Sequence, residues 1–238
     1  MTGLSDALAS EDGKARYVRG LFHTIAGRYD LITRVLSYGC DQRWKARLVE
    51  LSQPRAGLRA LDLATGTGDI AFALASRGCR VTALDLTLRM LQLAGGKPGG
   101  ASVGLIAGDM MALPFPSNAF DLVTSGYGIR NVARIETAVA EIRRVLSPGG
   151  LLLSLDFDRP SNALVRAVYL AYLSAVGSVL GLTLHGDPDT YRYIAESIRR
   201  YRGADGVSAL LARSGFAECR VIPLLGGLMA INVARRRD

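Results

Sequence analysis

Two carboxylates at the ends of successive apolar runs flank a glycine-rich turn. Asp62 lies near the end of the first run and is followed by Gly66 and Gly68, which open a predicted helix. Asp85 ends the second run, seventeen residues after Gly68. This spacing fits one helix and one return strand, so a right-handed βαβ unit would bring both carboxylates to the carboxyl edge of a parallel sheet. The pattern predicts a nucleotide pocket at a strand-to-helix turn.

The type of nucleotide follows from the charge at the turn. Gly66, Gly68 and Ala71 also match the relaxed G-x-G-x-x-[GA] fingerprint of dinucleotide sites. However, a pyrophosphate would be repelled by the carboxylate of Asp62 at the end of the strand. S-adenosylmethionine carries a sulfonium and an ammonium group but no phosphate, so the same charge attracts it, and Asp85 can accept hydrogen bonds from both ribose hydroxyls. The turn therefore predicts a site for S-adenosylmethionine.

Length and composition predict one α/β domain that binds a lipophilic ligand or contacts a membrane surface. The chain has 238 residues, of which 49% are hydrophobic, and its mean hydropathy is +0.21. These values are high for a freely soluble enzyme and point to a lipophilic ligand or a membrane surface as well as a core. Cys40, Cys79 and Cys219 lack metal-ligand or redox spacing. We therefore expect a reduced, cytoplasmic setting and no metal centre.

The charge and the amino terminus narrow the choice of partners. The net charge of +8 comes from dispersed basic residues without a stripe of aromatics between them, so we expect no nucleic-acid partner. Attraction to anionic lipid headgroups fits the same sign and leaves open a peripheral contact with the inner face of the membrane. Met1 to Gly13 lacks the charged and apolar regions of a secretory signal. The sequence also leaves a homodimer open.

Alternating strand and helix patterns predict a doubly wound, mostly parallel sheet. Helical segments are expected over Tyr17–Arg47, with a break at Tyr38-Gly39, and then the following elements along the chain: strand Arg59–Leu63, helix Asp69–Arg77, strand Arg80–Leu84, helix Thr87–Leu93, strand Val103–Ala107, strand Ala119–Ser125, helix Ile135–Leu146, a turn at 147–150, strand Leu151–Phe157, and closing strands Arg220–Leu225 and Leu228–Val233. We expect one domain, with an N-terminal helical cap over 1–52, a cofactor-binding core over 53–157, an inserted helical lid over 158–202, and a C-terminal helix with closing strands over 203–238.

An uncharged stretch of eighteen residues runs from Ala167 to Leu184. It is just long enough to raise the question of a membrane span. Its small and polar residues, Arg166 before it and its place between predicted strands favour a helical lid over the pocket instead. So apolar a lid suggests a lipophilic substrate, although the same pattern also fits a helix that only packs on the core.

Five blocks outside the glycine loop carry a family resemblance. They are Ile25-Ala26-x-Arg28-Tyr29-Asp30 with Leu36-Ser37 and Trp44, Leu113-Pro114-Phe115-Pro116, Tyr127-Gly128-Ile129-Arg130-Asn131-Val132, Arg144-Val145-Leu146-Ser147-Pro148-Gly149-Gly150, and Asp189-x-Tyr191-x-Tyr193-x-x-x-Ser197-Ile198. With these blocks in order over nearly its whole length, the chain resembles class I S-adenosylmethionine methyltransferases, and more narrowly the UbiE/MenG family of quinone C-methyltransferases. The resemblance implies a Rossmann-like sheet of seven strands and methylation of a prenylated quinol of the menaquinone or ubiquinone pathway.

The resemblance also implies site residues. Thr67, Asp85, Asp109 and Met110 would line the cofactor site, the last two beside the adenine. The full set expected around the cofactor is Tyr29, Asp62, Ala64, Gly66, Thr67, Gly68, Asp85, Leu86, Asp109, Met110 and Gly126.

Several positions depart from the family pattern. Ile32-Thr33 stands where Met-Asn is usual, and Asp41 replaces a histidine three residues before Trp44. Gly126 replaces a serine, and Asp156-Phe157-Asp158 replaces Glu-x-Ser. Because these changes gather near the expected substrate side, a relative that methylates a polyketide or another secondary metabolite remains an alternative. A third hypothesis is a catalytically silent subunit that organises a membrane-bound assembly, against which the joint presence of the site residues argues.

Methyl transfer to a ring carbon requires an electron-rich acceptor. Arg130 can stabilise a phenolate on the acceptor, and we expect Asn131 to fix the orientation of Arg130. Since arginine stays protonated, water or a carboxylate must take the phenolic proton, and Asp156 is the candidate. Tyr127, Tyr191 and Tyr193, with Tyr29, are expected to form an aromatic wall along the acceptor ring and the sulfonium.

Overall fold

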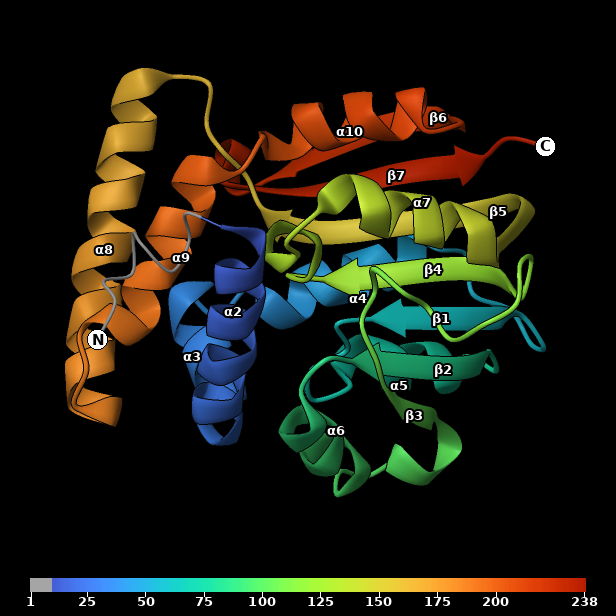
Figure 1. Cartoon of the computed structure of the whole chain (residues 1–238), viewed down its shortest axis with the longest axis horizontal. Coiled ribbons are helices and arrows are strands. Elements are labelled where there is room, and N and C mark those ends of the chain that lie inside the picture. Colours follow the sequence, from blue (N-terminus) through green and yellow to red (C-terminus); the bar gives the residue numbers. More distant parts are fainter. Residues whose placement is uncertain (1–9) are drawn as a thin grey trace.

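Seven strands form one sheet through the centre of the protein (Figure 1). The computed structural model describes residues 10–238. The strands are β1 (Arg59–Leu63), β2 (Arg80–Asp85), β3 (Gly104–Ala107), β4 (Phe120–Gly126), β5 (Leu146–Phe157), β6 (Phe216–Leu224) and β7 (Met229–Arg236). Their order is β3-β2-β1-β4-β5-β7-β6. Strands β1 to β5 are parallel, and β7 is antiparallel to both β5 and β6. The predicted fold class is confirmed.

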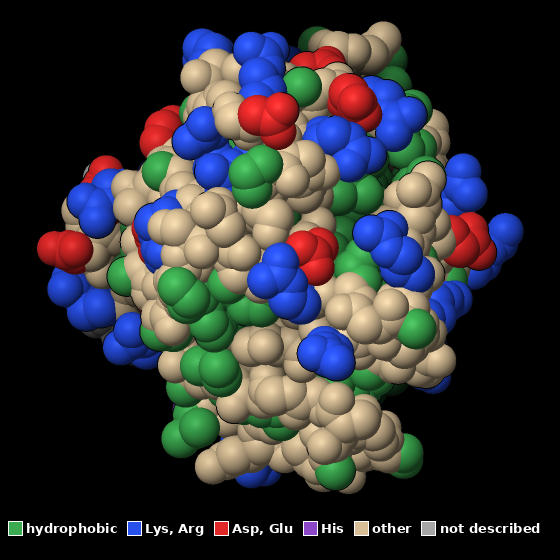
Figure 2. Space-filling model, turned by 90° about the vertical axis from the view of Figure 1, so that its right-hand side faces the viewer, with side chains coloured by type: hydrophobic (Ala, Val, Ile, Leu, Met, Phe, Trp, Pro, Cys, Tyr) green, Lys and Arg blue, Asp and Glu red, His purple; other side chains and the backbone are tan. Residues whose placement is uncertain are grey.

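Helices cover both faces of this sheet. α4 (Asp41–Leu51) and α5 (Asp69–Ala75) pack on one face, and α7 (Ile135–Val145) and α10 (Gly203–Arg213) pack on the other. The alternation of side chains along a strand divides the core accordingly: Ala60 belongs to the first layer, whereas Leu61 and Leu63 belong to the second. α6 (Leu88–Gly95) lies beside β3, and the short helix η2 (Gly100–Ser102) follows it. At the amino ends of the parallel strands, Lys and Arg side chains are scattered over the surface together with Asp and Glu (Figure 2).

A second group of helices stands beyond the carboxyl ends of the strands (Figure 1). It comprises α2 (Glu11–Ile25), η1 (Ala26–Arg28), α3 (Tyr29–Leu36), α8 (Ala163–His185) and α9 (Asp189–Arg200). α8 lies close against the start of α9 because two of its residues on that side, Gly177 and Gly181, have no side chain. A Cβ at Gly177 would lie 2.9 Å from the Tyr191 carbonyl oxygen. Within residues 10–238, α8 is the one helix long and apolar enough to cross a membrane. The expected role of this helix as a lid stays a prediction.

Most expected element boundaries agree with the structure within a few residues, but one does not. The segment 147–150 was expected as a turn before a strand, whereas β5 already begins at Leu146 and runs through it. The pairing of β5 with β4 shifts register between Phe120 and Leu122, and Gly149 has a φ of +71°. The glycines and proline therefore form an irregularity inside the strand. The predicted absence of a secretory signal concerns Met1 to Gly13, of which residues 1–9 lie outside the described part, as does the start of the 1–52 cap.

Candidate active site

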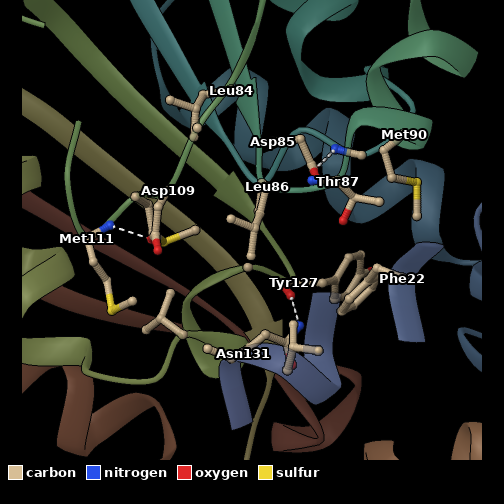
Figure 3. Close-up of a pocket in the computed structure, with 18 of the residues that line it drawn as sticks. Phe22, Leu84, Asp85, Leu86, Thr87, Met90, Asp109, Met111, Tyr127 and Asn131 are labelled. Atoms are coloured by element: carbon tan, nitrogen blue, oxygen red, sulfur yellow. Dashed lines mark hydrogen bonds between the residues drawn. The ribbon is translucent and has the colours of Figure 1, made fainter. Parts of the chain in front are cut away.

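A cavity lies at the carboxyl edge of the sheet, where the strand order reverses between β1 and β4. Figure 3 shows how its walls come from the loops after successive strands, with Phe22 of α2 on the opposite side. We call it the sheet-edge cavity. Its walls include these predicted cofactor residues: Tyr29, Ala64, Gly66, Asp85, Leu86, Asp109, Met110 and Gly126. This is the position at which open α/β sheets bind ligands.

Asp85 is held at one end of the sheet-edge cavity by the backbone. Its Oδ2 accepts a hydrogen bond from the Gly66 amide (2.8 Å) and its Oδ1 accepts one from the Thr87 amide (2.8 Å). Burial raises the pKa of the Asp85 carboxyl, and these two amides oppose the shift. Each carboxylate oxygen keeps a lone pair, so Asp85 can still accept two hydroxyl groups from a ligand.

Asp109 lies on the other side of the same cavity (Figure 3). Its Oδ1 accepts a hydrogen bond from the Met111 amide (2.8 Å). Apolar side chains surround the space between the two carboxylates, namely Leu84, Leu86, Met90, Met110 and Met111. A flat apolar ring with a polar edge fits between such walls.

The structure places Asp62 and Thr67 differently from the sequence-based expectation. Asp62 is 1% exposed, and its two oxygens accept hydrogen bonds from Thr65 Oγ1 (2.6 Å) and Thr124 Oγ1 (2.7 Å). Burial raises the pKa of Asp62 to about 6. The carboxylate therefore supports the glycine loop from beneath and does not line the sheet-edge cavity. It borders a smaller adjacent space, together with Thr67 and Asp69.

Gly68 has a conformational role. It caps the start of α5 with a φ of +90°, and a Cβ there would lie 2.4 Å from the ring of Phe72. It lines neither the sheet-edge cavity nor the smaller space beside it. The second glycine of the loop is thus required by a left-handed turn and close packing.

A second cavity adjoins the first beneath the N-terminal helices, and we call it the cap cavity. Its apolar walls are formed mainly by α2, α3 and α9, through Leu21, Phe22, Ile25, Ile32, Leu36, Tyr191 and Ile194. Four residues line both cavities: Phe22, Tyr29, Tyr127 and Asn131. The predicted tyrosines Tyr29, Tyr127, Tyr191 and Tyr193 all line the cap cavity. The two cavities therefore meet at a shared wall of aromatic and amide side chains.

Arg130 brings a buried cation to the cap cavity. It lies in η3 (Ile129–Asn131) and is 5% exposed. Its Nε donates to Asp156 Oδ1 (3.0 Å), its backbone amide donates to Asp156 Oδ2 (3.1 Å), and its Nη1 donates to Ser197 Oγ. Burial alone would lower the pKa of Arg130, but Asp156 foremost raises it. The guanidinium is charged and fixed.

Two expected roles around Arg130 are corrected by these contacts. Asn131 does not orient Arg130: its Nδ2 donates to the Tyr127 carbonyl (2.7 Å) and its Oδ1 accepts from the Tyr193 hydroxyl (2.9 Å). Asp156 and Ser197 orient Arg130 instead. Asp156 is 4% exposed and also accepts from the Phe157 amide (2.9 Å), so its carboxylate is occupied and lines neither cavity. This geometry argues against Asp156 as proton acceptor.

Tyr127 stands in the shared wall with an unusual backbone. Its φ is +61°, and its amide donates to the Leu155 carbonyl (2.7 Å). Its hydroxyl points away from the cavities and donates to Asp41 Oδ1 (2.7 Å). Burial first, and then Asp41, raise the pKa of Tyr127. The ring of Tyr127 therefore shapes the wall between the cavities. Asn131 holds the Tyr127 backbone carbonyl and Asp41 holds its hydroxyl.

Sequence reasoning missed an ionic network that joins the cap to the glycine loop. Lys45 Nζ lies 2.6 Å from Asp41 and 2.9 Å from Asp69, and Lys97 lies 2.7 Å from Asp30 and 3.3 Å from Asp69. Thr67 Oγ1 donates to Asp30 Oδ1 (2.6 Å), which links the loop to α3. In sequence, these charges resemble a solvated helix face, and only the departure at Asp41 drew attention to one of them.

Comparison with known proteins agrees with this site. A sequence model described as the ubiE/COQ5 methyltransferase family matches residues 10–236. The chain is 39% identical over 229 residues to the ubiquinone/menaquinone biosynthesis C-methyltransferase UbiE of Azotobacter vinelandii, covering 93% of this chain and 90% of that protein. It is 41% identical over 220 residues to the demethylmenaquinone methyltransferase of Thermus thermophilus, covering 91% and 100% respectively.

Solved structures show the same fold. An S-adenosylmethionine-dependent methyltransferase of Thermotoga maritima superimposes with a TM-score of 0.69 at 18% identity, over 92% of this chain and 100% of that chain. One from Aquifex aeolicus gives a TM-score of 0.58 at 17% identity, over 80% and 88%. The protein is therefore an enzyme with the class I methyltransferase fold, and it belongs to the ubiE/COQ5 methyltransferase family.

Proposed function

We propose that the enzyme binds S-adenosylmethionine in the sheet-edge cavity and methylates a ring carbon of a prenylated quinol in the cap cavity. The observation that carries this proposal is the junction of the two cavities. The sheet-edge cavity has polar groups suited to a nucleoside, whereas the cap cavity is mostly apolar, and Arg130 is the one charged residue among its described lining residues. An acceptor with a greasy tail and a ring oxygen fits that second set of groups.

The residues present fit the cofactor. Asp85 has lone pairs for two ribose hydroxyls, and the apolar slot beside Asp109 and Met110 suits an adenine. The smaller space under Ala64 and Gly126 is bordered by Asp62, Asp69 and Lys45. Its charged groups suit the ammonium and carboxylate of the methionine end. When bound, the cofactor supplies an electrophilic methyl group on a sulfonium.

The protein's part in the chemistry is to prepare the acceptor. The fixed guanidinium of Arg130 stabilises the phenolate formed when a ring hydroxyl loses its proton, and the charge makes the neighbouring ring carbon nucleophilic. That carbon would form the bond to the methyl group as the methyl–sulfur bond breaks and S-adenosylhomocysteine leaves. It would then lose its hydrogen as a proton, which restores the aromatic ring. Arg130 is too basic to accept protons, and Asp156 is occupied. Water in the cap cavity is therefore the proposed acceptor.

A second candidate acceptor is a polyketide or another aromatic secondary metabolite. Two of the departures from the family pattern, Ile32 and Thr33, line the cap cavity itself. Asp41 affects the cap cavity indirectly, because its carboxylate accepts a hydrogen bond from the hydroxyl of Tyr127, which lines that cavity. These residues change the acceptor side and leave the cofactor side intact.

A substrate series decides between the two candidates. The purified enzyme is given labelled S-adenosylmethionine and a panel of demethylated quinols with tails of increasing length, beside tail-free polyhydroxylated phenols. We expect kcat/KM to rise with tail length, because each buried methylene adds about 0.8 kcal/mol of binding. A preference for tail-free phenols would overturn the quinol proposal in favour of the second candidate.

We further propose that the enzyme works as a peripheral protein on the cytoplasmic face of the membrane, where a prenylated quinol resides. α8 exposes an apolar row, and α3 continues it beside α8; the exposed residues of this apolar surface are Leu164, Val165, Val168, Val179, Leu182, Leu31 and Val35. The helices share one hydrophobic cluster, in which Val176 and Leu180 of α8 pack together with Ile32 and Leu36 of α3. The cap cavity lies directly beneath α3. Such a patch suits a bilayer, and the charge of +8 suits anionic lipids.

Vesicle sedimentation tests the membrane proposal. We expect binding to vesicles that contain phosphatidylglycerol, and its loss in the double variant Val168→Asp/Val179→Asp. Leu88→Asp is the matched control, because Leu88 is 61% exposed on α6 and lies outside the apolar surface. Light scattering monitors assembly. If the wild type does not bind vesicles and forms a dimer, and if the double variant is a monomer, the surface is a subunit interface and the membrane proposal fails.

A further inference from the structure

A third cavity, of about 190 Å³, lies on another side of Arg130. It shares Arg130 and Tyr193 with the cap cavity but differs from it in chemistry. Its polar lining comes from the start of α2, from η3, from the first turn of α7 and from the end of α9: Lys14, Arg130, Glu136, Ser197, Arg200, Tyr201 and Arg202. We call it the basic cavity. The proposed methyl transfer uses none of these groups except Arg130 and Ser197, which orients it.

Positively charged side chains outnumber negatively charged ones in the lining of the basic cavity. Lys14, Arg130, Arg200 and Arg202 line it, whereas Glu136 is the one carboxylate among the described lining residues. Glu136 is already paired, at 2.5 Å from Arg202. Arg130 and Arg200 pair with carboxylates outside the lining, Asp156 and Glu196.

Among the cations that line the basic cavity, Lys14 forms no ion pair with any residue of the described part of the chain. Its Nζ donates to the carbonyl oxygens of Arg130 (3.0 Å) and Val132 (2.6 Å), and within residues 10–238 no carboxylate lies within 4 Å of it. An ammonium has three donors, so one remains available. Burial and then Arg130 lower the pKa of Lys14 to about 8. A positive charge is therefore held where both desolvation and a neighbouring cation oppose it.

A second donor is also unsatisfied. Tyr201 is 7% exposed and lines the basic cavity, and its hydroxyl has no hydrogen-bond partner within residues 10–238. This hydroxyl is not among the fully buried unpartnered atoms of the described residues, so it is open to the cavity. An ammonium and a phenol that share one polar cavity, next to further guanidinium groups, match the acceptor oxygens of a phosphate.

We propose that the basic cavity is a binding site for a phosphate group, with Lys14 and Tyr201 as its donors. The occupant would join the start of α2 to the end of α9. Because α2 also lines the sheet-edge cavity through Ala15, Val18 and Phe22, an occupied site would hold this wall closed. The phosphate can come from a free anion or from a lipid headgroup. Binding at this site does not depend on which acceptor is methylated.

Calorimetry on the full chain at pH 7 and constant ionic strength tests the proposal, with inorganic phosphate, pyrophosphate and a short-chain phosphatidic acid below its micelle concentration as separate ligands. We expect saturable binding of at least one ligand. Lys14→Met should weaken it about tenfold or more, equivalent to 1.4 kcal/mol. Tyr201→Phe removes only the hydroxyl and should weaken it as well. Binding of the inorganic anions identifies a free anion as the source, and binding of phosphatidic acid alone identifies a lipid.

Two controls keep the test falsifiable. Arg16→Met removes the same charge from an exposed position on α2, two residues from Lys14 and outside the basic cavity, and it should leave binding unchanged. Circular dichroism checks the fold of every variant. If Lys14→Met does not fold, the Tyr201→Phe result decides. Absence of saturable heat with all three ligands, or equal losses in Arg16→Met and Lys14→Met, would overturn the proposal.

Discussion

Arg130 and Asp156 form a buried ion pair at the wall of the cap cavity, with 3.0 Å between Arg130 Nε and Asp156 Oδ1. Their side chains are 4% and 5% exposed. A buried pair of this kind is weak evidence for stability, because desolvation offsets much of the attraction. It does fix the direction of the guanidinium, and pre-oriented charge is what stabilises a developing phenolate.

Arg130→Ala should therefore lower turnover more than cofactor affinity. We expect kcat to fall on the order of 100-fold, because one pre-oriented donor to a developing oxyanion contributes about that much. The dissociation constant for S-adenosylmethionine should change little. Steady-state kinetics and calorimetry measure the two effects.

Arg134→Ala is the control for Arg130→Ala, since Arg134 is exposed nearby and pairs with Glu11 at 3.7 Å. It should leave both quantities unchanged. Equal losses of kcat and of cofactor affinity in Arg130→Ala would show that Arg130 acts through the fold of the site.

Asp85→Asn should act on the cofactor instead. The amide places an N–H donor where Asp85 now accepts from the Gly66 and Thr87 amides, and it weakens the acceptors for the ribose. We expect cofactor affinity to fall by about 1–3 kcal/mol, or roughly 5-fold to 150-fold, with kcat at saturation less affected. Asp205→Asn, at an exposed position on α10, is the matched control. Unchanged affinity in Asp85→Asn would remove Asp85 from the cofactor site.

Tyr127→Phe separates shape from proton transfer. The hydroxyl of Tyr127 donates to Asp41 and points away from the cavities, so its loss should cost about 1–3 kcal/mol of unfolding free energy. Turnover at saturating substrate should stay near the wild-type value. If kcat instead falls on the order of 100-fold or more without loss of stability, Tyr127 takes part in proton transfer.

The stability contributed by Asp69 should depend on pH. Burial alone would raise the pKa of Asp69, but Lys45 foremost, with Gln42 and Lys97, lowers it to about 2 from an ordinary value of 3.8. A depressed pKa in the folded state gives stability that is present above about pH 4 and lost as the pH falls towards 2. The shift corresponds to about 2 kcal/mol.

Urea unfolding of the wild type and of Asp69→Asn across this pH range measures the difference. We expect the two unfolding free energies to converge near pH 2. A difference that does not vary with pH would mean that Asp69 has no altered pKa. Asp62 gives the opposite slope between about pH 4 and 6, because its raised pKa favours the protonated folded state, and this term is common to both proteins.

Strand periodicity and the glycine turn were sufficient to predict the sheet and the edge at which its ligand cavity lies. Asp85 is the last residue of β2 and Asp109 lies two residues after the end of β3, so their place at the carboxyl edge follows from the parallel order alone. The direction in which Asp62 points did not follow. Its hydrogen bond to Thr124 depends on the pairing of β1 with β4, between residues 62 positions apart.

Contacts between distant helices account for the other differences. Lys45 and Asp69 lie on α4 and α5, and each helix alone has the charge pattern of a solvated surface. Only the packing of both helices on one face of the sheet brings these charges together and buries them. Asn131 lines the cap cavity, but its hydrogen bond with the Tyr193 hydroxyl comes from α9, 62 residues away, which local spacing does not specify.

The position of the transferred methyl group tests the central claim most directly. The enzyme is incubated with S-adenosylmethionine that carries a ¹³C-methyl group and with a long-tailed demethylated quinol, and the product is examined by mass spectrometry and carbon NMR. The account predicts one label, bound to a ring carbon. A label on oxygen or nitrogen, or no transfer to any quinol while S-adenosylmethionine binds, would contradict it.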